Sequence, residues 1–477
     1  MKNFLLACVL LFSAYGIHAQ QDTWDLRRCV EYAIANNISV KQADVNARVF
    51  ALQAKLAHSL AYPNLSFSTS GGENFGRSID PTSNQYTTNS VFFQSYNLSA
   101  GITLFNFFRI KNDKKAADAA LSASDINLNA VRNNISLNVA AAYLNYLLSI
   151  ETANAAKLQI QQTAAQLSNT RKLVDAGSMP ELNAAQLEAQ LATDSSTYIT
   201  DKGLAEQNKI SLMGMLNLDA SVSFQVSVPD VDKIPLEPLS ELQPDYVYNL
   251  ALGTQPLQRF DSLNIVVQGY KIKSSRAAMY PTLTAFAQLG SNFASTFREF
   301  GGYYSTGKYD TLGVVPVNGT NYYALTPGFS SYTTKPSYWK QISNINFSQA
   351  FGVQLNVPLW NNRQLKSNYQ QSKLTLENLK LTQQQDNITL QTNIYQAYSS
   401  SVSALEKYNA AVKAYQIDQY AFELASKRYE IGVLSTIDYI TTQTNMFKAR
   451  IDQLSAHYDY VFKMKILEFY KGQGVKL

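Results

Sequence analysis

The sequence predicts a mainly α-helical fold with a smaller β part, in which one plan is written twice along the chain. Three observations predict it. The two halves of the 477-residue chain match at fixed offsets, and each half holds one very long stretch without glycine or proline. Each half also holds two runs in which apolar and polar residues alternate, which is the period of a strand. The plan in each half is a helix, two strands, a long helix and a second helix.

The N-terminal segment 1–19 is predicted to be a secretory signal peptide. Lys2 precedes an apolar run, and Ala19 stands at a suitable cleavage position. Cys8 follows Leu-Leu-Ala, which also suggests lipidation, but the apolar segment before it is too short. Cys29 is then the only cysteine of the mature chain, so no internal disulfide is possible. No later run of about 18 apolar residues follows, so we expect an exported protein without a transmembrane helix.

The internal repeat sets the expected boundaries. Tyr62-Pro63 matches Tyr280-Pro281 at an offset of 218, and Leu104-Phe105-Asn106 matches Leu359-Trp360-Asn361 at an offset of 255. The offsets differ by 37 residues (255 − 218), which indicates an insertion between Pro281 and Leu359. We therefore expect a first repeat over 20–228 and a second over 245–477. The linker 229–244 between them is rich in proline, which favours an extended chain.

Each repeat is expected to begin with a helix of about 35 residues that ends at the Tyr-Pro pair. Alternation then predicts the strands, and the insertion falls in a long polar loop of the second repeat, expected to be extracellular. The predicted strands lie at about 64–72, 95–104, 282–291 and 347–359, and the loop at about 292–346.

The long stretch of each repeat carries a heptad pattern. No glycine or proline occurs between Gly101 and Gly177 or between Pro358 and Gly432. Apolar or aromatic residues recur every seven positions from Val139 to Val174, with a second row of small residues three places later. The second repeat has the same two rows. Such rows are the a and d positions of a coiled coil, so we expect long helices with laterally packed partners.

Glycines predict the turns between the paired helices. Gly177 and Gly432 suit the left-handed position after a helix end. Ser178 with Glu181, and Ser435 with Asp438, have the spacing of a capping box at the start of the next helix. Each repeat is therefore predicted to contain a long helical hairpin with a tight tip.

The strands are of a length and pattern that suit an outer-membrane barrel, although an ordinary sheet packed on a core would also fit. Two observations favour the membrane: the loops between strands are polar, and aromatic residues gather at the strand ends, where an interface would need them. Those aromatic residues are Tyr62, Tyr280, Phe105, Phe107 and Trp360. Four strands cannot close a spanning barrel, and an open edge cannot face lipid, so if these strands span a membrane the barrel must be shared between subunits.

At this point the chain resembles the TolC-like outer membrane efflux proteins. The resemblance is carried by the starting helix "WDLRRCVEYAIANNISV", the two Tyr-Pro junctions, "LFN" with "LWN", and the tips "VDAGSMPELNAAQLEAQ" and "YEIGVLSTIDYITTQ". It covers nearly the whole mature chain. It implies a homotrimer in the outer membrane, with a twelve-stranded β-barrel continued by a long periplasmic α-helical barrel.

The resemblance also implies partners and site residues. The channel would work with a periplasmic adaptor protein and an inner-membrane pump of the resistance-nodulation-division or ATP-driven (ABC) type, and it would conduct drugs, other toxic small molecules or secreted protein. The tip residues that would meet the adaptor are Gly177, Ser178, Gly432, Val433 and Leu434.

Acidic residues often ring the constriction in this family, and Asp438 matches that position. A second acid is expected three residues later, but Thr441 stands there, and Asn183 occupies the matching place in the first repeat. A ring of Asp438 carboxylates would favour cations over anions. Asp438 could equally serve only as a helix cap, and both roles are compatible.

Composition and motifs argue against other classes. The formal charge of +5 is small and no dense basic block occurs, so no nucleic-acid partner is expected. Metalloprotease, serine-hydrolase, phosphate-loop and CxxC motifs are missing from the sequence, so we expect no enzyme, cofactor or metal. The alternative that remains is an exported coiled-coil scaffold or adhesin without a pore. It explains the heptads but leaves the aromatic-ended strands unexplained.

Overall fold

The computed structural model describes residues 23–79, 84–88, 90–228 and 234–472, so the expected signal peptide and part of the expected linker lie outside the described residues. The chain forms two compact units. The helical unit comprises the described residues up to Ala54, Ala116–Gly269 and the chain from Leu374, and the strand unit comprises Lys55–Lys115 and Tyr270–Lys373. Each unit draws on both sequence repeats, so the repeats are not separate domains.

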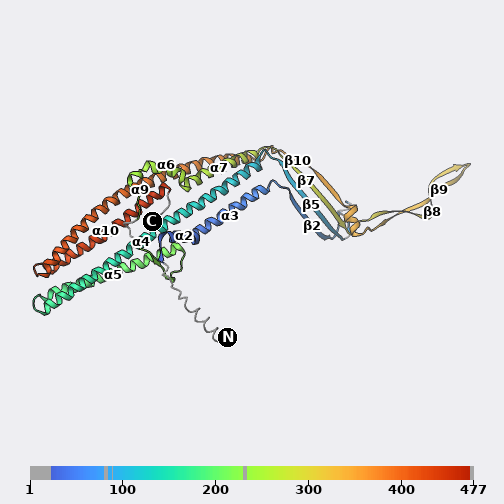
Figure 1. The fold of residues 1–477 in the computed structure, drawn as a ribbon. Helices are drawn as coiled ribbons and strands as arrows, with labels where there is room; N and C mark the ends of the chain where they lie inside the picture. The colour runs from blue at the N-terminus through green and yellow to red at the C-terminus, as the bar shows by residue number, and fades with distance from the viewer. Residues whose placement is uncertain (1–22, 80–83, 89, 229–233, 473–477) are drawn as a thin grey trace, which may run out of the picture. The chain divides into compact units, whose positions relative to one another are not determined.

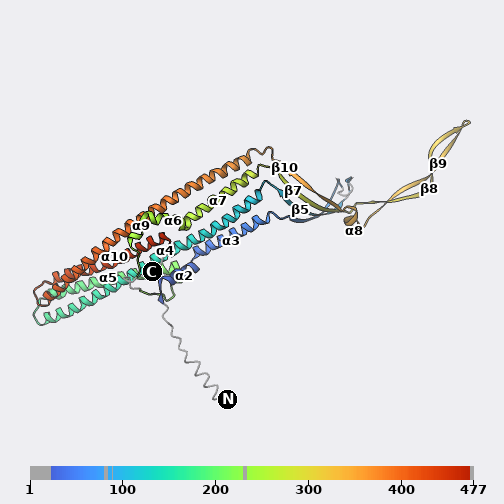
Figure 2. The same cartoon turned by 45° about the horizontal axis from the view of Figure 1, so that its top comes forward.

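The repeat extends to the helix boundaries. The long helices α4 and α9 both have 67 residues, and the helices that follow them, α5 and α10, both have 36. Both ends of α9 and of α10 lie 255 residues after the ends of α4 and α5. The bounds are Arg109–Asp175 for α4, Glu181–Leu216 for α5, Gln364–Glu430 for α9 and Thr436–Lys471 for α10. Figures 1 and 2 show that α4 runs beside α5 and that α9 runs beside α10, as the predicted hairpins require.

The expected single helix at the start of each repeat is wrong, because each is two helices. The first repeat has α2 (Leu26–Asn36) and α3 (Ile38–Ser59), and the second has α6 (Pro244–Thr254) and α7 (Pro256–Ala277). The breaks fall at equivalent residues, Asn37 and Gln255, which both have extended backbone.

Local chemistry explains both breaks. Gln255 precedes Pro256, which disfavours the helical conformation for the residue before it. Asn37 uses its side chain instead. Its Oδ1 accepts from the backbone of Ser39 at 2.9 Å, which caps α3, and its Nδ2 donates to the carbonyl of Met215 at 2.9 Å.

The core of the helical unit is also duplicated. One cluster is formed mainly by buried residues of α2, α4 and α5, together with Phe224 and with Tyr458 of α10. The other is formed by buried residues of α6, α9 and α10, together with Leu242. Equivalent positions recur in both: Cys29 and Val247, Val139 and Ile394, Leu212 and Leu467. Two short parallel strands, β1 (Thr23–Trp24) and β6 (Gln225–Val226), accompany the first cluster.

The predicted heptad seam is confirmed. No member of its four rows is exposed. The small-residue row of α4 is buried along its whole length, at Ala142, Ser149, Ala156, Thr163 and Thr170. Small buried side chains let neighbouring helices approach closely over many turns.

A buried ion pair ties the described end of the linker, which contains the 3-10 turn η2 (Leu239–Glu241), to α10. Lys465 Nζ lies 2.8 Å from Glu468 Oε2 and donates to the carbonyl of Pro235 at 2.7 Å. The other carboxylate oxygen of Glu468 accepts from the backbone of Glu237 at 3.0 Å. Both charged side chains are buried, at 5% and 6% exposure, so each depends on the other for compensation.

An acidic pair links α7 to α9 in the helical unit. Asp261 is buried, and burial together with the nearby carboxylate of Asp386 raises the pKa of Asp261 to about 6. Near neutral pH the folded protein must therefore hold a carboxylate in an unfavourable setting.

The strand unit contains a four-stranded antiparallel sheet in the order β10-β7-β5-β2. Its strands lie close to the predicted segments: β2 at Asn64–Asn74, β5 at Val91–Phe105, β7 at Thr282–Ala294 and β10 at Ser348–Asn356. The offset between β2 and β7 is again 218 at their first residues.

The expected long loop over 292–346 holds secondary structure that the sequence analysis missed. It contains the hairpin β8 (Glu299–Val317) and β9 (Thr320–Thr334), then the short helix α8 (Tyr338–Lys340) and the π-helical turn η3 (Gln341–Ile345). The first-repeat loop likewise holds a short pair, β3 (Ser78–Ile79) with β4 (Tyr86–Thr87). These segments are rich in polar and aromatic residues, so they were predicted to be loops and their strands were missed.

Candidate functional site

The tips of both helical hairpins end in the same turn. Gly177 and Gly432 have φ of +71° and +75°, a left-handed conformation that glycine adopts without a steric penalty. After α4, Ser178 N donates to the carbonyl of Leu173 at 2.8 Å, and Val433 N donates to that of Arg428 at 2.9 Å after α9. These bonds form a Schellman motif at each tip, so the predicted glycine turns are confirmed.

The two predicted helix caps differ in outcome. Ser435 is the N-cap of α10, where its hydroxyl accepts from Asp438 N at 3.1 Å and donates to Asp438 Oδ2 at 2.7 Å. Ser178 is not a cap, because α5 begins two residues later than a capping box there would require. Pro180 occupies the N-cap position and has no side-chain oxygen to offer.

Just behind the tips, a group of side chains joins the two hairpins, and we call it the tip cluster. Its members are Thr170, Leu187, Tyr429, Thr436 and Tyr439. The rings of Tyr429 and Tyr439 stack at 4.7 Å between centroids, and Leu187 of the first hairpin packs against them. Aromatic stacking of this kind adds about 0.5–1.5 kcal/mol beyond area burial.

The Tyr429 hydroxyl contacts both hairpins. Its oxygen lies 3.3 Å from Thr170 Oγ1 of α4 and 3.1 Å from Thr436 Oγ1 of α10, and all three side chains are buried. Tyr439, by contrast, keeps its hydroxyl within the second hairpin, where it pairs with Ser426. Burial raises the pKa of Tyr439 to about 12, so this hydroxyl stays protonated at physiological pH.

The predicted constriction residues lie on two helices. Asp438 and Thr441 are exposed and, being three residues apart on α10, share one helix face. Asn183 is half-buried at the equivalent place on α5. A single chain carries one Asp438 carboxylate, so the predicted ring would need other copies of the chain.

The predicted adaptor-contact residues are mostly exposed at the tips. Gly177, Ser178 and Gly432 are exposed, Val433 is 61% exposed, and Leu434 packs on the tip cluster. The hydrogen bonds of the tip cluster were not predicted. Thr170 and Tyr429 belong to the heptad rows. Their polar groups at positions that face a helix seam are the sequence feature that could have predicted these hydrogen bonds.

The four-stranded sheet has two chemically distinct faces. Cross-strand partners share a face, so the register places apolar side chains on one side. One such row is Phe67, Leu98 and Leu289. The other side is polar and hydrogen-bonded, with Ser66 to Ser99 at 2.7 Å and Gln288 to Asn97 at 2.9 Å.

The outer strands of this sheet each have one partner within the described chain. β2 pairs only with β5 and β10 only with β7 there, which leaves a row of backbone donors and acceptors along each outer edge. Such edges template pairing with another chain.

The predicted boundary aromatics fall into two groups. Phe105, Phe107 and Tyr280 are in ring contact, with centroids 4.9 Å apart for the first two and 4.8 Å for Phe107 and Tyr280. Tyr62 and Trp360 stand apart and are highly exposed, at 73% and 76%.

Three further features of the described residues bear on function. None of the described helices has a segment long and apolar enough to cross a membrane. Within the same residues, no cluster of three or more His, Cys, Asp or Glu has an arrangement that could hold a metal ion. Cys29 is buried and burial raises its pKa to about 12, so it is a poor nucleophile.

The chain is duplicated, and it folds into two long helical hairpins and a sheet with two different faces and two open edges. These features define the class of outer-membrane channel subunits with periplasmic helices. Comparison with known proteins agrees. The profile of the outer membrane efflux protein family matches residues 29–218 and 248–464, and the chain belongs to this family. It is an outer-membrane protein that extends into the periplasm.

Individual relatives are distant in sequence but similar in length. The outer membrane efflux protein BepC of Brucella suis is 21% identical over 473 residues, which cover 96% of this chain and 88% of the relative. The toluene efflux pump outer membrane protein TtgC of Pseudomonas putida is 18% identical over 432 residues, covering 89% and 78%. The Campylobacter jejuni CmeC outer membrane channel has a TM-score of 0.72 at 19% identity, covering 95% of this chain and 87% of that one. VceC of Vibrio cholerae gives 0.71 at 14% identity, covering 94% and 97%.

Proposed function

We propose that this chain forms, as a homotrimer, the outer-membrane channel of a tripartite export system and serves as a passive conduit from the periplasm to the exterior. The observation that carries the proposal is the sheet, which has one apolar face, one polar face and two open edges. An open edge cannot face lipid, so the sheet must close with other copies. Three copies supply about twelve strands, which exceeds the minimum of about eight for a spanning barrel.

The apolar face then meets lipid and the polar face lines the pore. The boundary aromatics suit the interface between lipid and water, where rings with polar atoms are favoured. Tyr62 and Trp360 are the most exposed of them, so most of each side chain is free to meet that interface.

The exposed tips are the proposed contact with a periplasmic adaptor, which would connect the channel to a resistance-nodulation-division or ABC pump. Apolar side chains there are left open to solvent: Ile431 is 73% exposed, Val433 61% and Ile437 59%. Relatives such as the toluene efflux pump outer membrane protein TtgC support a toxic small molecule as cargo ahead of secreted protein.

Deletion of the gene tests the transport role. The deletion strain should become more sensitive to a panel of toxic apolar compounds, and the intact gene should restore resistance. Purified channel should run as a trimer and conduct ions in planar bilayers. Recovery of a soluble periplasmic monomer without conductance would instead support the coiled-coil scaffold without a pore.

Asp438 is the proposed cation-binding residue of the constriction, in addition to its role at the start of α10. Asp438→Ala should weaken block of single-channel current by divalent cations at least several-fold, since three carboxylates would be lost at once. Asp438→Asn separates the two roles, because an amide can still accept from Ser435 while the charge is gone. Glu181→Gln, an exposed acid in the first turn of α5, is the matched control. Unchanged block in both Asp438 variants would remove this residue from the constriction.

A further inference from the structure

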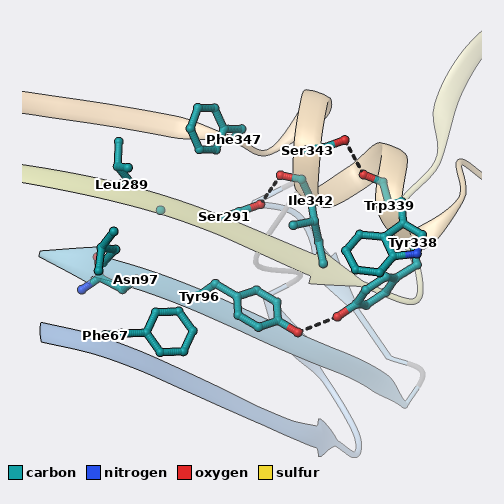
Figure 3. Close-up of a pocket in the computed structure, with 12 residues that line it drawn as sticks. Phe67, Tyr96, Asn97, Leu289, Ser291, Tyr338, Trp339, Ile342, Ser343 and Phe347 are labelled. Atoms are coloured by element: carbon teal, nitrogen blue, oxygen red, sulfur yellow. Dashed lines mark hydrogen bonds between the residues drawn. The ribbon is translucent and has the colours of Figure 1, made fainter.

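A pocket of about 530 Å³ lies on the apolar face of the four-stranded sheet, beneath the segment that follows the β8–β9 hairpin. Its floor is the row Phe67, Leu98 and Leu289, and its cover includes Trp339 and Ile342. Figure 3 shows Phe67 and Leu289 of the floor, with the cover residues Trp339 and Ile342 on the helical segment beside the sheet. The volume lies in the range of pockets that hold small molecules, about 300–1,000 Å³.

Hydrogen bonds fix the cover to β7, so the pocket is preformed. Ser291 donates to the carbonyl of Ile342 at 2.7 Å, and Asn346 Nδ2 donates to the carbonyl of Asn292 at 2.7 Å. Gln341, which is fully buried, accepts from the backbone of Ala294 at 3.2 Å. Part of the cover is the π-helical turn η3, a rare form that is frequent at functional sites.

The pocket is graded in polarity along the strands. Toward the C-terminal end of β5 it is bounded by the apolar floor row. Toward the loop end, Tyr96 and Tyr338 share a hydrogen bond of 2.5 Å, and Tyr338 donates to Gln94 at 2.7 Å (Figure 3). No residue that lines it is charged. An occupant should therefore be an uncharged apolar chain whose polar end points to the loops.

We infer that this pocket binds an acyl chain of a membrane lipid. The inference rests on the proposed function, because it takes the apolar face as the lipid-facing one. The pore cargo would pass the polar face, on the other side of the sheet. A second copy of the chain would pair along β2 or β10, whereas the floor of the pocket spans β2, β5 and β7. Lipid is thus the apolar partner that this face meets.

Tryptophan fluorescence gives a direct test, because the chain has three tryptophans. Trp339 lines the pocket and is 73% exposed, and Trp360 lies outside the pocket and is 76% exposed, so the two rings differ in the pocket and not in exposure. Trp24 packs on Phe224 in the helical unit and gives a constant background. The variants Trp360→Phe and Trp339→Phe each leave one reporter in the strand unit. Each is placed in lipid nanodiscs that contain a small fraction of phosphatidylethanolamine brominated on its acyl chains, which quenches tryptophan on contact.

We expect Trp339 to be quenched at least twofold more than Trp360 at low fractions of brominated lipid. Filling the pocket with Leu98→Phe and Leu289→Phe should reduce the quenching of Trp339 to the level of Trp360. The control Ala287→Phe adds the same ring on the same face of β7, outside the pocket, and should leave the quenching unchanged. Native mass spectrometry of the unmodified protein should show retained phospholipid, and the two-site variant should lose it.

Two results would overturn the inference in distinguishable ways. Equal quenching of both tryptophans, unaffected by the filled pocket, would mean that bulk lipid merely bathes the sheet, and the channel proposal would stand. Quenching of neither tryptophan would show that the apolar face does not meet lipid, and the proposed function would fail with it. Circular dichroism of the same preparations confirms that each variant is folded, whether or not it conducts.

Discussion

The Tyr429 hydroxyl allows a direct test of how the channel opens. In the described chain it contacts Thr170 of the first hairpin and Thr436 of the second, at 3.3 and 3.1 Å. If opening separates the hairpins at their tips, as a rearrangement of packed helices would, the contact to Thr170 is lost. The variant Tyr429→Phe removes this contact in advance while it keeps the ring that stacks on Tyr439.

The size of the effect follows from the hydrogen bond. A neutral hydrogen bond contributes about 1 kcal/mol net, and the partner left unpaired in a buried site raises that cost slightly. One broken contact should therefore shift the balance between closed and open tips about fivefold. In the proposed trimer each subunit has one such contact. If all three break together, they amount to about 3 kcal/mol, or a shift of about a hundredfold. The number of subunits that move in one step can be read from the result.

Single-channel recording in planar bilayers measures the open probability directly. Tyr439→Phe is the matched control, since Tyr439 is also a buried tyrosine but its hydroxyl pairs with Ser426 inside the second hairpin and does not join the hairpins. The reasoning would be refuted if Tyr429→Phe left the open probability unchanged, or if Tyr439→Phe raised it equally.

Three further predictions concern stability, measured by denaturant unfolding of the detergent-solubilised protein. Asp261 has a pKa raised to about 6, so its folded form resists ionisation, and stability is lost as pH rises from about 4 to 6. Asp261→Asn should add about 1–2 kcal/mol at pH 7 and flatten this slope, whereas an unchanged slope would assign it to other groups. Lys465→Met should cost about 3–5 kcal/mol by leaving Glu468 buried without a partner, and adding Glu468→Leu should recover most of it; additive losses would contradict the coupling. Gly432→Ala should cost about 1–2 kcal/mol because of its positive φ, while Gly203→Ala, in the middle of α5 with open space around it, should stabilise slightly.

The sequence determined the repeated plan, the hairpin tips and the strands, because each depends on residues close together in the chain. A glycine after a helix needs only its own backbone to adopt a left-handed turn, and alternation along ten residues is enough to define a strand with two faces. The break at Gln255 is also a local effect, because it is caused by the proline that follows. The break at Asn37 depends on a capping side chain as well.

Tertiary structure alone decided the features that join distant residues. Thr170 and Tyr429 are 259 positions apart, and the sequence marks them only as seam residues whose partners are unspecified. The ion pair of Lys465 and Glu468 looks like an ordinary exposed i,i+3 pair until the linker covers it. The lipid pocket exists because an inserted segment folds back over the sheet. A heptad or an alternating run says which side of an element is buried, but the partner on that side is set by packing, which no local pattern encodes.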